Sequence, residues 1–227
     1  MGFAEYVATN GTELYFRAQQ HFLLVAYAVG IAAVIALTLG IVLHTTSLTP
    51  ASWSTQLRAG SLETTLIVSS AALTVPSLAL FGILQPSLGL GVTPSLVALT
   101  IYGVYPILRN VVAGLGSVDP AVLDSARGMG MGSTRRMVRI QLPLAWPVIV
   151  SGIRVATLIL IGIAVVAALV SGPGFGQLLF SGLARLGAVN SFNQVLAGTF
   201  GCLVVAAVYE IAFFVVARLT TPRGIRV

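Results

Sequence analysis

The chain has 227 residues, of which 57% are hydrophobic and only 8% are charged, and its mean hydropathy is +0.99. A soluble domain carries about a quarter charged residues, so this composition excludes a water-soluble globular protein and indicates an integral membrane protein. All twelve basic residues are arginines, and a P-loop needs a lysine that reaches the nucleotide phosphates, so the sequence also excludes a Walker-type ATPase despite its formal charge of +6.

Apolar segments long enough to cross a membrane recur along the chain. A transmembrane helix needs about 20 mostly apolar residues, and such segments lie at 22–44, 63–84, 93–111, 147–170 and 195–217. Residues 1–20 carry Glu5 and Glu13 where a cleavable signal sequence would be basic, so we expect the first segment to remain as an anchor. The sequence therefore predicts an all-α integral membrane protein with about five transmembrane helices between residues 21 and 217.

Prolines and glycines divide these segments. We expect a turn at Gln85–Gly89, between the second and third spans, because this stretch combines proline, serine and glycine. Pro76 and Pro106 lie inside predicted spans, where proline removes a backbone hydrogen bond and kinks the helix. They either shape a translocation path or only set the geometry of the bundle.

Arginines are distributed unevenly over the segments that connect the spans. With the N-terminus outside the cytoplasm, only Arg17 and Arg185 fall on the outer side. The cytoplasmic side then receives nine: Arg58, Arg109, Arg127, Arg135, Arg136, Arg139, Arg218, Arg223 and Arg226. Because basic residues are retained on the cytoplasmic side, the sequence predicts an extracytoplasmic segment 1–20, a cytoplasmic loop 112–146 and a cytoplasmic tail 218–227.

The polar stretch within the cytoplasmic loop has the signals of two short helices. Asp119 and Pro120 mark a helix start, since aspartate caps the free N–H groups and proline is tolerated at the first helical position. We expect this helix to run to about Arg127 and to end in the glycines that follow it. We expect Ser133 to cap a second helix that Pro143 stops. Such a helix–turn–helix is either a basic loop on anionic lipid headgroups or a docking element.

The spacing of this stretch resembles the EAA loop of ABC importer permeases. That loop reads Glu-Ala-Ala, three residues, Gly, nine residues, Ile-x-Leu-Pro, and this chain has Asp124-Ser125-Ala126, Gly130 and Ile140-x-Leu142-Pro143 at the same spacing. Asp124 replaces the glutamate and Ser125 the first alanine, whereas the remaining positions fit. The signature covers twenty residues of a predicted cytoplasmic loop.

Further segments resemble the betaine/carnitine/choline (osmoprotectant) branch of these permeases. Thr74–Leu80 is similar to that branch's Thr-Ile-Pro-Ser-Leu-Ala-Leu, and Tyr102–Asn110 to its Tyr-x-x-x-Pro-Ile-x-Arg-Asn. Ser151–Arg154 and Pro222–Gly224 also fit. The chain departs from the pattern at Ser171–Gly176, where the family has Gly-Ala-Gly-Gly-Leu-Gly.

The resemblance implies a type I ABC importer permease fold with a cytoplasmic coupling helix that binds a separate ATPase. The residues of this coupling loop would be Asp124, Ser125, Ala126, Arg127, Gly128, Gly130, Ile140, Leu142 and Pro143. Its partners would be a second permease subunit, identical or different, an ATPase pair that binds ATP and magnesium, and an extracytoplasmic solute-binding protein. The chain itself would then hold no cofactor and catalyse no reaction. Its solute would be glycine betaine, choline, carnitine or a proline-like compound.

Other functions remain open at this point. An ABC permease for another small solute, such as an amino acid, would share the same loop. A secondary transporter or channel would be expected to show inverted repeats or more intramembrane carboxylates, which the five unequal segments and the single Glu210 do not favour. A membrane scaffold without transport activity is compatible with the composition.

Two charged residues fall inside predicted spans, where charges are functional candidates. Arg154 follows the inner start of the fourth span and Glu210 precedes the inner end of the fifth. At about 1.5 Å per residue, both lie about 10–12 Å below the inner surface. Because their depth is similar and their charges are opposite, we hypothesise that they pair and lock the two spans together. The alternative is that each is satisfied separately.

The outer loop between these spans is rich in glycine. Gly172, Gly174 and Gly176 would supply unusual backbone angles, and the following 177–186 would form a short re-entrant helix that gates the outer side. An ordinary flexible connector is the alternative. His21 and His44 flank the first span, and we expect them at the membrane interfaces. The sequence has no cluster with metal-ligand spacing.

Overall fold

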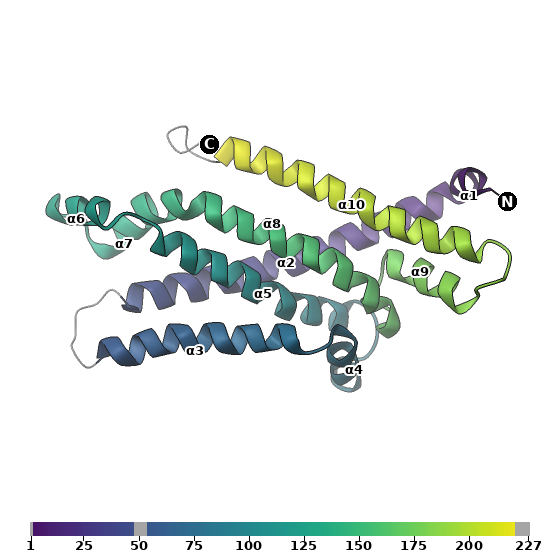
Figure 1. The fold of residues 1–227 in the computed structure, drawn as a ribbon, viewed down its shortest axis with the longest axis horizontal. Coiled ribbons are helices and arrows are strands. Elements are labelled where there is room, and N and C mark those ends of the chain that lie inside the picture. Colours follow the sequence, from purple (N-terminus) through teal and green to yellow (C-terminus); the bar gives the residue numbers. More distant parts are fainter. Residues whose placement is uncertain (1, 48–53, 221–227) are drawn as a thin grey trace.

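A computed structural model describes residues 2–47 and 54–220, and this part of the chain is an elongated bundle of helices without strands (Figure 1). In chain order, the helices are α1 (Phe3–Thr9), α2 (Gly11–Ser47), α3 (Ser54–Thr74), α4 (Ser77–Leu88), α5 (Val92–Gly116), α6 (Pro120–Gly128), α7 (Ser133–Arg136), η1 (Met137–Gln141), α8 (Leu142–Val166), η2 (Ala167–Val170), α9 (Phe175–Ala184) and α10 (Ser191–Thr220). The terminal Arg223 and Arg226 lie outside the described residues.

Helix α5 is the centre of the bundle. It packs along α2 on one side and α8 on another, and it also contacts α3 and α4. Leu99, Ile107 and Leu108 are fully buried in these contacts. Apolar residues recur around most of its circumference, which is the pattern of a helix surrounded by other helices. Helix α10 lies at the edge, against α9, α8 and α2.

Four described helices are long and apolar enough to span a membrane, namely Gly11–Thr45, Val92–Gly116, Ser133–Val170 and Ser191–Thr220. A fifth span exists only if the bent pair Glu63–Thr74 and Ser77–Leu88, which meet at 94°, is counted as one. The structure therefore agrees with about five spans when the bent pair is counted as one. The second span is not the single helix expected over residues 63–84.

The break in the second span has a local cause. Pro76 has no N–H to donate and its ring disfavours a helical conformation at Val75, and Pro76 itself adopts φ −58° and ψ 132°. The Tyr102 hydroxyl of α5 donates a hydrogen bond of 2.7 Å to the Val75 carbonyl. A carbonyl released from the helix is thereby satisfied by a neighbouring helix.

The turn expected at Gln85–Gly89 is displaced along the chain. Helix α4 continues to Leu88 with Pro86 inside it, so the first four residues of the expected turn are helical. The chain reverses instead at Gly89 and Gly91, whose φ angles are +74° and +100°. Glycine adopts such angles at low cost and proline cannot, which explains why the reversal occurs after the proline.

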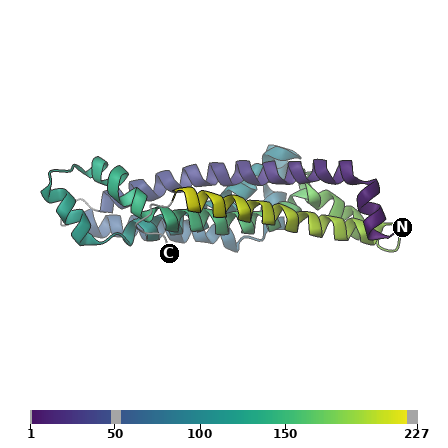
Figure 2. The same ribbon diagram turned by 90° about the horizontal axis from the view of Figure 1, so that it is seen from above.

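The bundle has two distinct ends (Figures 1 and 2). Helices α6 and α7 form one end, and α1 and α9 lie at the other. Helix α2 begins at Gly11, so the helix of the first span extends well into the segment that the sequence placed before the membrane. Tyr6 of α1 is buried against Leu178 of α9 and Ala197 of α10, and it fixes α1 to these two helices.

Candidate functional site

Helix α6 forms at one end of the bundle, where the sequence predicted it. Asp119 Oδ1 accepts a 2.8 Å hydrogen bond from the Ala121 N–H, and Pro120 occupies the first helical position. The helix ends at Gly128, and Gly130 takes a φ of +78°. The Gly130 N–H donates to the Arg127 carbonyl at 2.9 Å, which closes the turn. A residue with a side chain is disfavoured at this φ.

The second predicted helix differs from expectation at both ends. Ser133 is its first residue, Gly132 holds the cap position, and no side chain caps it. Pro143 does not stop the helix, because the chain winds through a π-helix at Met137–Gln141 and continues as α8. Pro143 lies at the start of α8, directly after the hydrogen-bond register changes, where its missing N–H is tolerated. The part of the predicted coupling loop that begins at Ser133 and the fourth span therefore form one helical path.

The predicted coupling residues are arranged on two sides. Asp124 and Arg127 are exposed and form an ion pair of 3.4 Å between Oδ1 and Nη1. Ala126 is buried. Ser125 is exposed, and its hydroxyl donates to the Ala121 carbonyl at 2.8 Å. The remaining predicted residues on α8 and η1, which are Ile140, Leu142 and Pro143, are partly buried.

One exposed apolar residue of this end was missed by sequence reasoning. Met129 lies between Gly128 and Gly130 and is 71% exposed. A β-carbon added at either glycine would meet no atom within 4 Å. The sequence signal for Met129 is that it is an apolar residue within a polar, glycine-rich turn. The tip of this segment thus presents a flexible apolar side chain, with open space on both sides, beside the Asp124–Arg127 pair.

Arg154 and Glu210 are brought together by α8 and α10. Arg154 Nε donates to Glu210 Oε1 at 2.9 Å, and Nη2 contacts Oε2 in a second, parallel contact. Such two-point contact is favoured by the planar guanidinium. The two side chains are 52% and 30% exposed. An ion pair therefore joins two predicted spans on the outside of the subunit.

The glycine loop at 171–176, which the sequence predicted on the outer side, is packed tightly and does not have the form of a loose connector. A β-carbon at Gly172 would lie 2.5 Å from Ser95 Oγ, one at Gly174 2.8 Å from His21 Nδ1, and one at Gly176 2.0 Å from the Val165 carbonyl oxygen. Atoms cannot approach so closely, so these three positions accept only glycine without movement. The loop leads into α9, where the sequence predicted a short helix.

His21, which the sequence placed at the end of the first span, lies inside the subunit beneath the glycine loop. It is fully buried, and its Nε2 lies 3.2 Å from the Ile161 carbonyl oxygen of α8. Its ring is 6.0 Å from that of Phe175, and Gly174 covers it. The cause is the glycine loop, which folds back over α2, and this long-range contact leaves no local signal in the sequence.

A polar chain also fastens α9 to α2. Arg17 Nη1 donates to Gln177 Oε1, and Gln177 Nε2 donates to the Gly172 carbonyl at 2.9 Å. Arg17 additionally forms an ion pair of 3.4 Å with Glu13. Sequence reasoning used Arg17 only for orientation and missed this role. The spacing of Arg17 and His21, one turn apart on α2, is the only signal that both contact the same loop.

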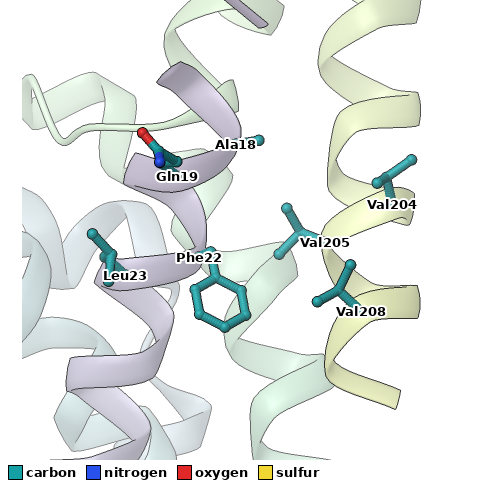
Figure 3. A pocket seen from close by; sticks show the side chains of 7 residues that line it. All are labelled: Ala18, Gln19, Phe22, Leu23, Val204, Val205 and Val208. Atoms are coloured by element: carbon teal, nitrogen blue, oxygen red, sulfur yellow. The ribbon is translucent and has the colours of Figure 1, made fainter. Parts of the chain in front are cut away.

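A groove on the side of the bundle is mainly apolar. It has a volume of about 370 Å³ and lies between α2 and α10, lined by Ala18, Gln19, Phe22, Leu23, Val204, Val205 and Val208 (Figure 3). Gln19 is its single polar residue, so the groove offers little to orient a polar ligand. Within the described residues, no three metal-ligating side chains gather.

Comparisons with known proteins give a consistent result. Residues 63–223 match the family described as binding-protein-dependent transport system inner membrane component. The chain is 33% identical to the choline transport system permease protein OpuBB of Bacillus subtilis (strain 168), over 98% of this chain and 95% of that protein. It is 32% identical to the osmoprotectant import permease protein OsmW of Salmonella typhimurium (strain LT2), over 97% and 98%.

A solved structure shows the same fold. The MetNI methionine ABC transporter, in an inward-facing conformation, superimposes with a TM-score of 0.77 over 92% of this chain and 96% of that chain. The two sequences are 18% identical, so this similarity concerns the fold alone.

Proposed function

This chain belongs to the family of binding-protein-dependent transport system inner membrane components, and we propose that it is the permease subunit of an ATP-driven importer of small compatible solutes. The predicted fold class, an all-α type I ABC importer permease with up to five spans, is confirmed. Relatives that match over nearly their full length are themselves transport permeases.

The observation that carries the proposal is the coupling loop. Its helix α6 projects at one end of the bundle and carries the exposed Asp124–Arg127 ion pair. Met129, directly after α6, is exposed, and a β-carbon added at either neighbouring glycine would meet no atom within 4 Å. An apolar anchor surrounded by polar groups is the usual anatomy of a protein contact. A glycine turn connects α6 to α7, and α7 continues through η1 into α8, a predicted span. A partner that binds α6 would therefore act on the membrane part of the chain.

The proposed partners follow from this arrangement. A pair of cytoplasmic ATPase subunits would bind α6 and would hold the ATP and magnesium, since this chain has no lysine for a P-loop. A second permease subunit, identical or different, would complete the path through the membrane. A separate binding protein would deliver solute at the end that carries α1 and α9.

The proposed orientation places α6 in the cytoplasm and the N-terminus outside. Its support is the exposed Arg127, Arg135 and Arg139 at the α6 end, against the exposed Arg185 near α9 at the other. Basic residues are retained on the cytoplasmic side of membrane proteins. The location would be a bacterial inner membrane.

The proposed solute is choline, glycine betaine, carnitine or a related compound. The support is the set of relatives, which includes a choline permease and a glycine betaine/carnitine/choline permease, both from Bacillus subtilis (strain 168). Uptake of radiolabelled choline, glycine betaine, carnitine and methionine by vesicles that contain the whole transporter tests this. Uptake of methionine alone would contradict it and favour an amino-acid importer.

Attachment of the ATPase is tested by purification of the complex. We expect Asp124→Arg and Met129→Glu each to lower the ATPase recovered with the permease by about tenfold or more, which corresponds to a lost contact of at least about 1.4 kcal/mol. Arg185→Glu, an exposed change at the opposite end, is the matched control and should recover the ATPase fully. Equal recovery with all three variants would refute the coupling role of α6.

For the ion pair, we propose that Arg154 and Glu210 lock α8 to α10. A double-mutant cycle with Arg154→Ala and Glu210→Ala measures the coupling between them. We expect the double variant to lose clearly less stability than the sum of the two single variants. Additive losses would show that the two charges act separately.

A further inference from the structure

Arg154 and Glu210 lie deep between the ends of their helices. The Trp146 indole N–H donates a 2.7 Å hydrogen bond to Thr220 Oγ1, which joins the inner part of α8 to the last residue of α10. Tryptophan is enriched at membrane interfaces, so this contact marks the inner interface. At about 1.5 Å per residue, Arg154 lies about 12 Å and Glu210 about 15 Å beyond it. In a hydrocarbon core about 30 Å thick, both are near the middle.

At this depth, other residues of the subunit do not fully cover the Arg154–Glu210 pair. The Arg154 side chain is 52% exposed and the Glu210 side chain 30% exposed. The guanidinium has five N–H donors, and Glu210 accepts from Nε and Nη2 while no other acceptor lies within reach in the described chain. The unused donors require oxygen atoms from outside the subunit. Lipid tails supply none.

Neighbouring positions extend the same uncovered face. Ser151 and Leu158 lie one turn on either side of Arg154 on α8, and Ala207 lies one turn from Glu210 on α10; all three are exposed. We call these five residues the Arg154 face. Arg154 does not extend toward the inner interface, because Glu210 holds it at its own level.

We propose that the Arg154 face lines the water-filled solute path of the assembled importer. This inference rests on the proposed function and adds where the path runs. Water satisfies the remaining donors of the guanidinium, and the pair offers both signs of charge with no net charge. A small cationic or zwitterionic solute would therefore contact both charges and would not bind tightly to a single unpaired charge. Passage requires such weak binding, because the solute must also leave.

The other edge of α10 has a different chemistry. Val208 points into the apolar groove between α2 and α10 (Figure 3), and Val215 lies two turns further along the same edge. Both are about half exposed, at 47% and 46%. These positions suit contact with lipid or apolar protein, and they provide a matched control on the same helix.

Cysteine labelling of the complete transporter in vesicles tests the proposal. Cys202 is the chain's single cysteine, so Cys202→Ala gives a background whose solute uptake is measured first and reports separately on the proposed function. Ser151→Cys, Leu158→Cys and Ala207→Cys are then compared with Val208→Cys and Val215→Cys. The probe is a positively charged, membrane-impermeant methanethiosulfonate.

In complexes that retain uptake, we expect the three test positions to react at least about tenfold faster than the two controls, because only a thiolate in contact with water reacts. Labelling should also block uptake. Test positions that stay unlabelled, or controls that react equally fast, would overturn the proposal. A disulfide between two permease subunits at Ser151→Cys, without labelling, would also overturn it and assign the face to a subunit contact.

Discussion

The two ends of the bundle use glycine for opposite reasons. At the end that carries α9, called the outer end after the proposed orientation, Gly172, Gly174 and Gly176 are enclosed so closely that an added β-carbon would meet atoms at 2.0–2.8 Å. At the end that carries α6, called the inner end in the same way, Gly128, Gly130 and Gly132 have no atom within 4 Å of that position. Both loops look alike in the sequence, where each alternates glycine with other residues.

The difference indicates which end is complete in one chain. The outer loop is held by contacts within the subunit, from His21, Ser95 and the chain of Arg17 and Gln177. The turn at the α6 end is held by its own backbone hydrogen bonds and by the positive φ of Gly130, and no described side chain from the rest of the bundle encloses its glycines. Any further constraint on it must come from another molecule. Substitutions should therefore affect the fold at the outer end and partner binding at the inner end.

The largest effect is expected for Gly176→Ala. Its β-carbon would lie 2.0 Å from the Val165 carbonyl oxygen, which is backbone and cannot rotate away. We expect destabilisation of about 3 kcal/mol or more, at the upper range of overpacked sites, measured as the melting temperature of the purified permease. Gly162→Ala, on α8 with no atom within 4 Å, is the control and should melt normally. Equal melting temperatures would contradict the packing described for the loop.

A smaller loss is expected for Gln177→Leu. The change removes the bond from Arg17 Nη1 and the bond to the Gly172 carbonyl, while Arg17 keeps its ion pair with Glu13. Unsatisfied buried groups cost about 1–3 kcal/mol. Gln19→Leu, an exposed glutamine near it on α2, should have little effect in the same melting assay. A Gln177→Leu permease as stable as the Gln19→Leu control would show that α9 is held by apolar packing alone.

At the inner end, Gly130→Ala should cost about 1–2 kcal/mol, which is the strain of a left-handed backbone with a β-carbon. Gly130→Asn should cost less, because asparagine tolerates this conformation better. Melting of the isolated permease measures both. If Ala and Asn behave identically, steric conflict and not backbone angle limits this position.

The smallest change in stability is expected for Gly128→Ala, within about 0.5 kcal/mol, as for other surface substitutions. Its β-carbon would project into open space beside Met129. In the assembled transporter, however, we expect less ATPase to be recovered with this variant. Full recovery would place the ATPase contact elsewhere on the segment.

Features set by neighbouring residues were predictable from the sequence. Asp119, Pro120 and the glycines defined α6, because capping and turn preferences are local. The Arg154–Glu210 contact followed from matched depth and opposite charge on two predicted spans. Pro76 was a sequence signal for the break in the second span, but the continuous high hydropathy of residues 63–84 led to the prediction of one helix.

Apart from the Arg154–Glu210 pair, whose opposite charges stand out in apolar spans, features set by distant contacts were not predictable. His21 is buried because a loop about 150 residues later packs over it, and a pattern within one helix does not reveal such a neighbour. Pro143 was read as a stop because proline ends a regular α-helix. The π-helix before it changes the hydrogen-bond register and removes that conflict.

The helical path from Ser133 to Val170 covers 38 residues, from the α6 end of the bundle to the glycine loop beneath α9. In mechanical terms it is a single strut. We expect a displacement of the end near α6 to move the end near α9 as well, because main-chain hydrogen bonds connect the two ends. In the proposed importer, we therefore expect opening on one side of the membrane and closing on the other to result from one displacement of this segment.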